Sequence, residues 1–105
     1  MTTVRFQRQG KNIRSVEVTD HAGYGQAGED IVCSAVSSSL MLTDTLLEDV
    51  WGIPVHQEIQ EEPPRICLVM PEDGDARAQD ALVALQMHFK SLKEEYPDFI
   101  EVLEV

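Results

Sequence analysis

Residues 75–95 carry their apolar side chains in a single stripe. Successive members of the stripe are four, three, four and three residues apart, and they are Ala78, Leu82, Leu85, Phe89 and Leu92. This spacing places all of these side chains on one face of an α-helix. Because such a face must be buried against another apolar surface, the stripe predicts a helix that packs on other parts of the chain and ends before Pro97.

A second helix is predicted from about residue 29 to residue 50, a segment without glycine or proline. Its apolar positions recur at helical spacing, at Val32, Val36, Leu40, Leu47 and Val50. Asp30 is a suitable N-cap, since a carboxylate there accepts a hydrogen bond from an N–H group of the first turn. Gly52 and Pro54 are expected to stop the helix.

The remaining segments have the patterns of β-strands. Residues 3–8 and 13–19 alternate between apolar and polar side chains around a turn, which predicts a β-hairpin. Residues 55–61 also alternate and suit an exposed or edge strand. Residues 65–70 are nearly continuously apolar and suit a buried central strand. We expect residues 99–105 to close the domain as a last strand.

The predicted order of elements is β-β-α-β-β-α-β, which places the chain in the α+β class. One sheet with two helices packed against one side is the economical arrangement for this order. The length of 105 residues suits a single domain with a modest core. We therefore expect one two-layer domain over residues 1–105.

The charge of the chain is strongly negative, at −11 from 8 basic and 19 acidic residues. Such a surface repels phosphate backbones, so we expect no direct binding of nucleic acid. It attracts a basic partner, although solubility alone accounts for it equally well. No apolar run approaches the roughly 20 residues of a membrane span, and the N-terminus lacks the apolar segment of a signal peptide. We therefore expect a cytoplasmic protein that does not bind membranes.

Two cysteines in a cytoplasmic chain do not indicate a disulfide. The sequence contains no Cys-x-x-Cys pair and no His-x-x-x-His pair, so we expect neither a structural metal nor a cofactor. Cys67 lies in the most apolar segment and is expected to pack in the core. His56 and His88 have no partner in the sequence and are expected to be surface or structural residues.

The segment between the hairpin and the first helix combines groups that suit thiol chemistry. His21 is expected to end a strand, and Cys33 is expected in the first turn of the helix, where the helix dipole stabilises a thiolate. A histidine within hydrogen-bond reach would accept the thiol proton, and free N–H groups would stabilise an oxyanion. The glycine-rich loop between them would close over a bound peptide. Composition alone favours a buried structural cysteine at position 33 and a solvated histidine at position 21, and their joint placement around a glycine-rich loop shifts the balance only partway.

The glycines of this loop also match a nucleotide-binding pattern. Gly23, Gly25 and Gly28 have the spacing Gly-x-Gly-x-x-Gly of the dinucleotide fingerprint. However, the preceding strands suggest a hairpin, and the carboxylates of Glu29 and Asp30 would stand where a pyrophosphate binds. The chain is also short for a doubly wound sheet. These points speak against a nucleotide-binding domain.

The segment from His21 to Ser37 resembles the signature of the bacterial ribosomal-processing cysteine protease family. The resemblance consists of His-Ala-x-Tyr-Gly followed by Gly-x-Asp-Ile-Val-Cys-x-Ala-Val-Ser, carried by His21, Ala22, Tyr24, Gly25, Gly28, Asp30, Ile31, Val32, Cys33, Ala35, Val36 and Ser37. It implies a catalytic dyad of Cys33 as nucleophile and His21 as base. Asp20 departs from the pattern, because a glycine is expected before the histidine.

The resemblance also implies a substrate and an assembly state. The implied substrate is the N-terminal extension of large ribosomal subunit protein twenty-seven, which is removed after a short apolar stretch containing Phe-Phe during ribosome assembly. The implied assembly is a homodimer, and no cofactor is implied. An alternative that does not use the dyad is a non-enzymatic, ribosome-associated binding module that acts through its acidic surface.

Several residues are expected to support the dyad. Asp30, as an N-cap, would accept the backbone N–H of Cys33. Ser37 lies one helical turn after Cys33 and would bond the thiol or the substrate, or only pack. Tyr24, together with Gly23, Gly25 and Gly28, is expected to form the loop that binds substrate.

Overall fold

The computed structural model describes residues 1–20 and 29–105; the side chains of Asp20, Glu29 and Asp30 lie outside this description. The predicted order of elements is confirmed. In chain order they are β1 (Thr2–Gln9), β2 (Asn12–Asp20), α1 (Glu29–Thr45), η1 (Leu46–Val50), β3 (His56–Gln60), β4 (Arg65–Val69), α2 (Ala76–Glu95) and β5 (Ile100–Glu104). The helix η1 is a π-helical turn that directly continues α1.

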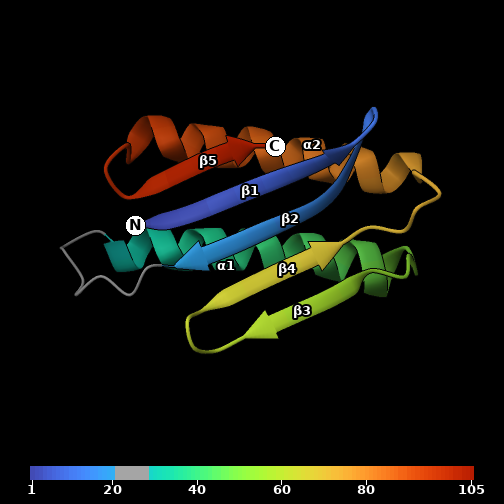
Figure 1. Cartoon of the computed structure of the whole chain (residues 1–105), viewed down its shortest axis with the longest axis horizontal. Helices are drawn as coiled ribbons and strands as arrows, with labels where there is room; N and C mark the ends of the chain where they lie inside the picture. The colour runs from blue at the N-terminus through green and yellow to red at the C-terminus, as the bar shows by residue number, and fades with distance from the viewer. Residues whose placement is uncertain (21–28) are drawn as a thin grey trace.

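The strands form one sheet in the order β3-β4-β2-β1-β5. The hairpin β1–β2 is antiparallel, as are the pairs β2–β4 and β3–β4, whereas β5 runs parallel to β1. Both helices lie on the same side of the sheet (Figure 1). The prediction of an α+β domain with two helices against one sheet is therefore confirmed, and β3 is an edge strand as expected.

The core fills the space between the sheet and the helices. Its fully buried members come from both layers and include Val4, Phe6, Val16 and Leu68 of the strands and Val32, Val36, Leu40, Leu82 and Phe89 of the helices. The rings of Phe6 and Phe89 meet with their centroids 6.1 Å apart. The apolar stripe predicted for residues 75–95 is buried as expected, with Leu92 packed at its margin.

The ends of the helices follow local rules. Asp75 caps α2, because its carboxylate accepts the backbone N–H of Arg77 at 2.8 Å. Gly52 follows η1 with a φ of 66°, a conformation that glycine adopts without strain, so the predicted stop is confirmed. The side chain of Gln79 anchors α2 to β2 through two hydrogen bonds to the backbone of Ile13, at 2.7 and 2.9 Å.

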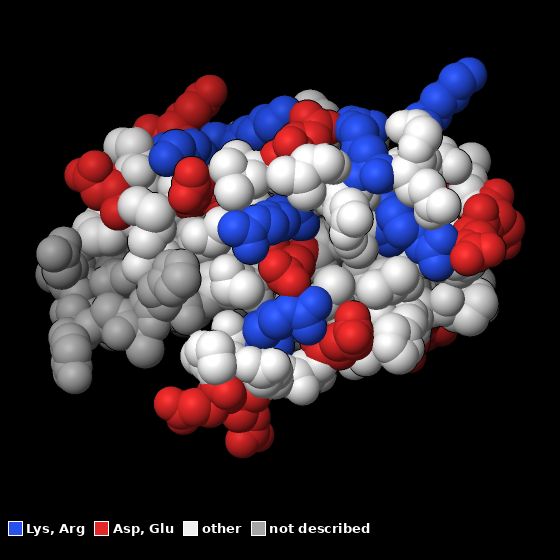
Figure 2. All heavy atoms as spheres, viewed as in Figure 1, with Lys and Arg blue, Asp and Glu red and all other residues white. Residues whose placement is uncertain are grey.

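The other face of the sheet carries charged side chains, and no helix of residues 1–20 and 29–105 covers it (Figure 1 and Figure 2). Figure 2 shows Lys and Arg gathered over the strands, with Asp and Glu between and around them. A shallow hollow of about 550 Å³ on this face is lined by Arg5, Arg8, Arg14 and Arg65, among others. Four of the eight basic residues of the chain therefore meet on one face.

Candidate active site

Cys33 lies on α1 and is half-buried. The helix begins at Glu29, so Cys33 is its fifth residue and opens the second turn. The expectation that it lies in the first turn is therefore wrong by about one residue. Helical side chains lean back toward the N-terminus of their helix, so this thiol projects over the first turn. The positive end of the helix dipole still lies within its reach, although the effect declines beyond the first turn.

Asp30 lies within the helix. It is the second residue of α1 instead of the residue that precedes the helix, so the predicted N-cap is wrong by its position. The N–H groups left free by an α-helix are those of its first four positions, and Cys33 lies beyond them. A helix that begins earlier than the sequence indicated therefore removes the predicted hydrogen bond from the Cys33 N–H.

His21 and the loop residues Gly23, Tyr24, Gly25 and Gly28 lie outside the described residues, so their predicted roles stay predictions. Strand β2 is described as far as Asp20. The prediction that His21 ends this strand falls outside the described residues. The end of β2 and the beginning of α1 lie at the same end of the molecule (Figure 1).

The two other histidines lie away from the face of α1 that carries Cys33. His56 pairs with Val69, which lines the hollow on the open face of the sheet. His88 of α2 lines an apolar groove with Leu42 of α1, on the side of α1 that faces α2. Neither position supplies a base to the thiol of Cys33.

A flank of α1, defined by Cys33, Ser37 and Asp44, faces the edge strand β3. Ser37 is half-buried and follows Cys33 by one turn, as predicted, and Asp44 follows Cys33 by three turns. The amide of Gln57 on β3 donates to Asp44 and also to Glu48, at 2.9 Å from Glu48 Oε2. The edge strand is thus tied to the same flank of the helix that carries the thiol.

Asp44 is an unusual buried carboxyl that the sequence did not single out. Its side chain is 6% exposed, and within the described chain its Oδ1 has no hydrogen-bond donor. Burial, followed by the neighbouring carboxylate of Glu48, raises the pKa of Asp44 to about 6. A proton shared between the two carboxyls would satisfy the buried Oδ1. The spacing of four residues between Asp44 and Glu48 places the two carboxyls side by side on a helix. The contact from Gln57 has no sequence signal, because it comes from a different element.

Cys67 is buried, but on the opposite face of the sheet from the helical core. It pairs with Glu17 and Glu58 across β4 and lines the charged hollow. The prediction that Cys67 is buried is therefore confirmed, but the prediction that it belongs to the core is wrong, because Cys67 lies on the other face of the sheet. Burial raises the pKa of the Cys67 thiol, and nearby Arg65 opposes this in part. A thiol with a raised pKa is a poor nucleophile near neutral pH.

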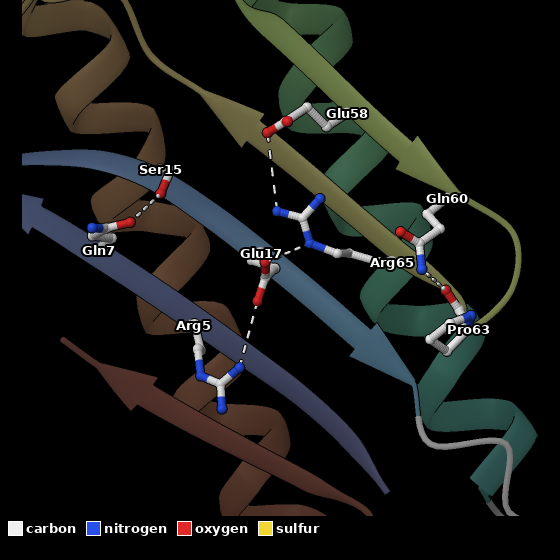
Figure 3. Close-up of polar contacts among 8 residues, drawn as sticks. All are labelled: Arg5, Gln7, Ser15, Glu17, Glu58, Gln60, Pro63 and Arg65. Atoms are coloured by element: carbon white, nitrogen blue, oxygen red, sulfur yellow. Dashed lines mark hydrogen bonds and ion pairs between the residues drawn. The ribbon is translucent and has the colours of Figure 1, made fainter.

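The charges around Cys67 form a small network of ion pairs. Glu17 bonds Arg65 at 2.6 Å and approaches Arg5 at 3.5 Å, and Arg65 also lies 4.0 Å from Glu58 (Figure 3). The guanidinium groups are thus neutralised largely by carboxylates of neighbouring strands. This clustering could not be predicted from the sequence, because it depends on the register of β1, β2, β3 and β4.

In residues 1–20 and 29–105, no group of three or more His, Cys, Asp or Glu side chains could hold a metal ion. The segment Ile31–Val50 is long and apolar enough to span a membrane by composition, with a mean hydropathy of 1.3. The expectation that no segment approaches this length is therefore wrong. The buried face of this helix belongs to the core, which accounts for its apolar composition.

Comparisons with known proteins support the protease interpretation. In fold, the chain is similar to SMU.848 from Streptococcus mutans, with 28% identity and a TM-score of 0.89, over 100% of this chain and 94% of that one. It is also similar to the ribosomal processing protease Prp from S. aureus in complex with a substrate peptide, with 19% identity and a TM-score of 0.91 over 100% of both chains.

A second structure of the S. aureus protease, with a covalently linked product peptide, gives a TM-score of 0.86 at 20% identity over 100% of both chains. At these identities the S. aureus structures establish the fold alone. A search of curated proteins finds no match. The family model described as cysteine protease Prp matches residues 1–101. The chain therefore belongs to the Prp family and is a cysteine protease.

Proposed function

We propose that Cys33 is the nucleophile of this protease and that His21 is its general base. The carrying observation is the contrast between the two thiols of the chain. Cys33 is half-buried at the beginning of α1, whereas Cys67 is buried on the far side of the sheet with a raised pKa. Among the histidines, His56 and His88 occupy other surfaces, which leaves His21 as the candidate base.

The proposed reaction uses the dyad twice. His21 accepts the Sγ proton of Cys33, and the thiolate attacks the carbonyl carbon of the scissile peptide bond. Collapse of the tetrahedral intermediate breaks the C–N bond, and the leaving amine takes the proton from His21. Water, deprotonated by His21, then hydrolyses the thioester and regenerates the Cys33 thiol. Free N–H groups at the start of α1 are suited to stabilise the oxyanion.

The proposed substrate is the N-terminal extension of large ribosomal subunit protein twenty-seven, cleaved after its apolar stretch during ribosome assembly. The family membership and the likeness to a ribosomal processing protease support this proposal. The net charge of −11 suits a basic ribosomal protein as the body of the substrate. A homodimer belongs to the same proposal and follows from the family resemblance. A cytoplasmic location also belongs to it and follows from the N-terminal sequence, which lacks the apolar segment of a signal peptide.

Cleavage of the extended ribosomal protein by the purified enzyme tests the proposal. We expect Cys33→Ser and His21→Ala to lose cleavage, while the matched control Cys67→Ser keeps it. Full activity in Cys33→Ser or His21→Ala would show that the dyad is assigned wrongly. Binding of the ribosomal protein without any cleavage by the wild type would favour the alternative of a binding module that acts through its acidic surface.

A further inference from the structure

We propose that Ile59 and Ile66, on the helix-facing side of the β3–β4 hairpin, form an apolar subsite that selects the substrate of this protease. This pair is called the hairpin subsite below. The inference rests on the proposed function and adds a specificity determinant to it. Its occupant would be an apolar side chain of an extended substrate segment.

The register of the sheet shows that the hairpin subsite faces the helices. Val18 of β2 pairs with Ile66 of β4, and Ile66 pairs with Ile59 of β3. Directly paired residues point to the same face of a sheet, and Val18 belongs to the core. Exposure rises along this row from 7% at Val18, through a half-buried Ile66, to 63% at Ile59. The core-facing row thus ends in an isoleucine that the helices leave uncovered.

The next row of paired residues on the same face ends in a polar side chain instead of an apolar one. Val16 and Leu68 are fully buried, and the row closes at Gln57, whose amide binds Asp44 and Glu48 of the first helical segment. The edge strand is therefore held against the helix at Gln57 and is uncovered at Ile59. Ligand sites are largely apolar and carry a few fixed polar groups. The exposed Ile59 beside the anchored Gln57 has this combination.

The uncovered end of the row lies toward the catalytic thiol. Asp44, which Gln57 contacts, is on the same flank of α1 as Cys33 and three turns after it. The strand β3 runs toward the end of the molecule where α1 begins (Figure 1). Ile59, two residues beyond Gln57, therefore lies on the Cys33 side of that anchor.

Helix and strand geometry give the separation. Eleven helical residues from Cys33 to Asp44 span about 16 Å, at 1.5 Å per residue. Two strand residues from Gln57 to Ile59 recover about 7 Å of that distance. The remaining 10 Å or so corresponds to about three residues of extended peptide. We therefore expect the apolar side chain in the hairpin subsite to lie about three residues from the scissile bond.

The edge position of β3 suits an extended peptide as the occupant. The outer side of β3 has no strand partner within the described sheet, and all five of its residues are exposed. A peptide that pairs with this edge places alternate side chains on the helix-facing side, beside Ile59. A second copy of the chain suits the edge less well, because antiparallel pairing centred on this strand sets Glu58 against its own copy.

Steady-state kinetics on peptides test the subsite. We expect Ile59→Asp to lower kcat/KM by at least about tenfold on a peptide with an apolar residue three positions from the scissile bond, because a carboxylate there cannot bury that residue. Met87→Asp is the matched control, since Met87 is similarly exposed at 66% but lies on α2. This control should stay within about twofold of the wild type.

A complementary pair of changes, a lysine in the enzyme and an aspartate in the peptide, distinguishes a loss of specificity from a loss of folding. Ile59→Lys should cleave a peptide with aspartate at the same position at least about tenfold better than the wild type does. Wild-type kinetics in Ile59→Asp, or no gain with the complementary pair, would overturn the subsite while leaving the protease assignment intact. A wild-type enzyme that cleaves neither the peptides nor the ribosomal protein would overturn the proposed function, and the subsite with it.

Discussion

Replacing Asp44 by asparagine should stabilise the protein at neutral pH. Asp44 is 6% exposed, and burial together with Glu48 raises the pKa of its carboxyl from 3.8 to about 6. The folded state therefore binds this proton more tightly than the unfolded chain does. The contribution of this proton to the free energy of unfolding is fully present below about pH 4 and is lost as the pH rises to about 6. The difference of about two pKa units corresponds to about 3 kcal/mol lost at neutral pH.

Asparagine keeps the shape of the side chain and removes the charge. Its carbonyl accepts from Gln57, and its amide donates to Glu48, so the hydrogen bonds are preserved. We expect Asp44→Asn to be more stable than the wild type by about 2–3 kcal/mol at pH 7.5, which corresponds to roughly 10 °C in melting temperature. The advantage should shrink toward zero near pH 4.

Urea denaturation followed by the fluorescence of Trp51, the single tryptophan, measures this difference across the pH range. Asp98→Asn is the control, because it removes an exposed acidic charge that is not among the causes of the raised pKa of Asp44. This control should change stability by less than about 0.5 kcal/mol. A variant Asp44→Asn that is less stable than the wild type at pH 7.5, or equally more stable at every pH, would refute the shared-proton explanation.

Three further predictions follow from the fold and the site. Near neutral pH, iodoacetamide should alkylate Cys33 at least roughly tenfold faster than Cys67, because burial raises the pKa of Cys67; equal rates by mass spectrometry would contradict this. Gln79→Ala should cost about 1–3 kcal/mol in urea, because it leaves the backbone N–H and C=O of Ile13 without their partner; an unchanged midpoint would refute that role. Phe89→Ala should cost about 3–5 kcal/mol, since the ring is fully buried against Phe6; a loss below 1 kcal/mol in the same assay would argue against the described core.

Much of the fold could be predicted because its elements have distinct periodicities. The apolar side chains of α2 fall on one face only if the segment is helical. The alternation in β1 and β2 indicates a hairpin. The sequence does not show which face of the sheet Cys67 lies on. Because β4 is apolar at nearly every position, no alternation of apolar and polar side chains distinguishes its two faces. Only the pairing with Glu17 and Glu58 shows which face it occupies.

The site was predictable only where its parts are local in sequence. Cys33 and Ser37 are one turn apart, so their common flank follows from helix geometry. The bonds from Gln57 to Asp44 and Glu48 join different elements across a loop, and no local pattern predicts them. The exact start of α1 was also uncertain from sequence, because Glu29 and Asp30 are both suited to the beginning of a helix.

Covalent trapping with a peptide chloromethyl ketone, mapped by mass spectrometry, tests the assignment of the nucleophile most directly. The reagent should carry the apolar sequence of the proposed substrate, so that its attachment depends on binding at the active site. We expect one adduct, on Cys33, and a much slower reaction in His21→Ala. An adduct on Cys67, or unchanged labelling and cleavage in Cys33→Ser, would contradict the assignment of Cys33 as the nucleophile.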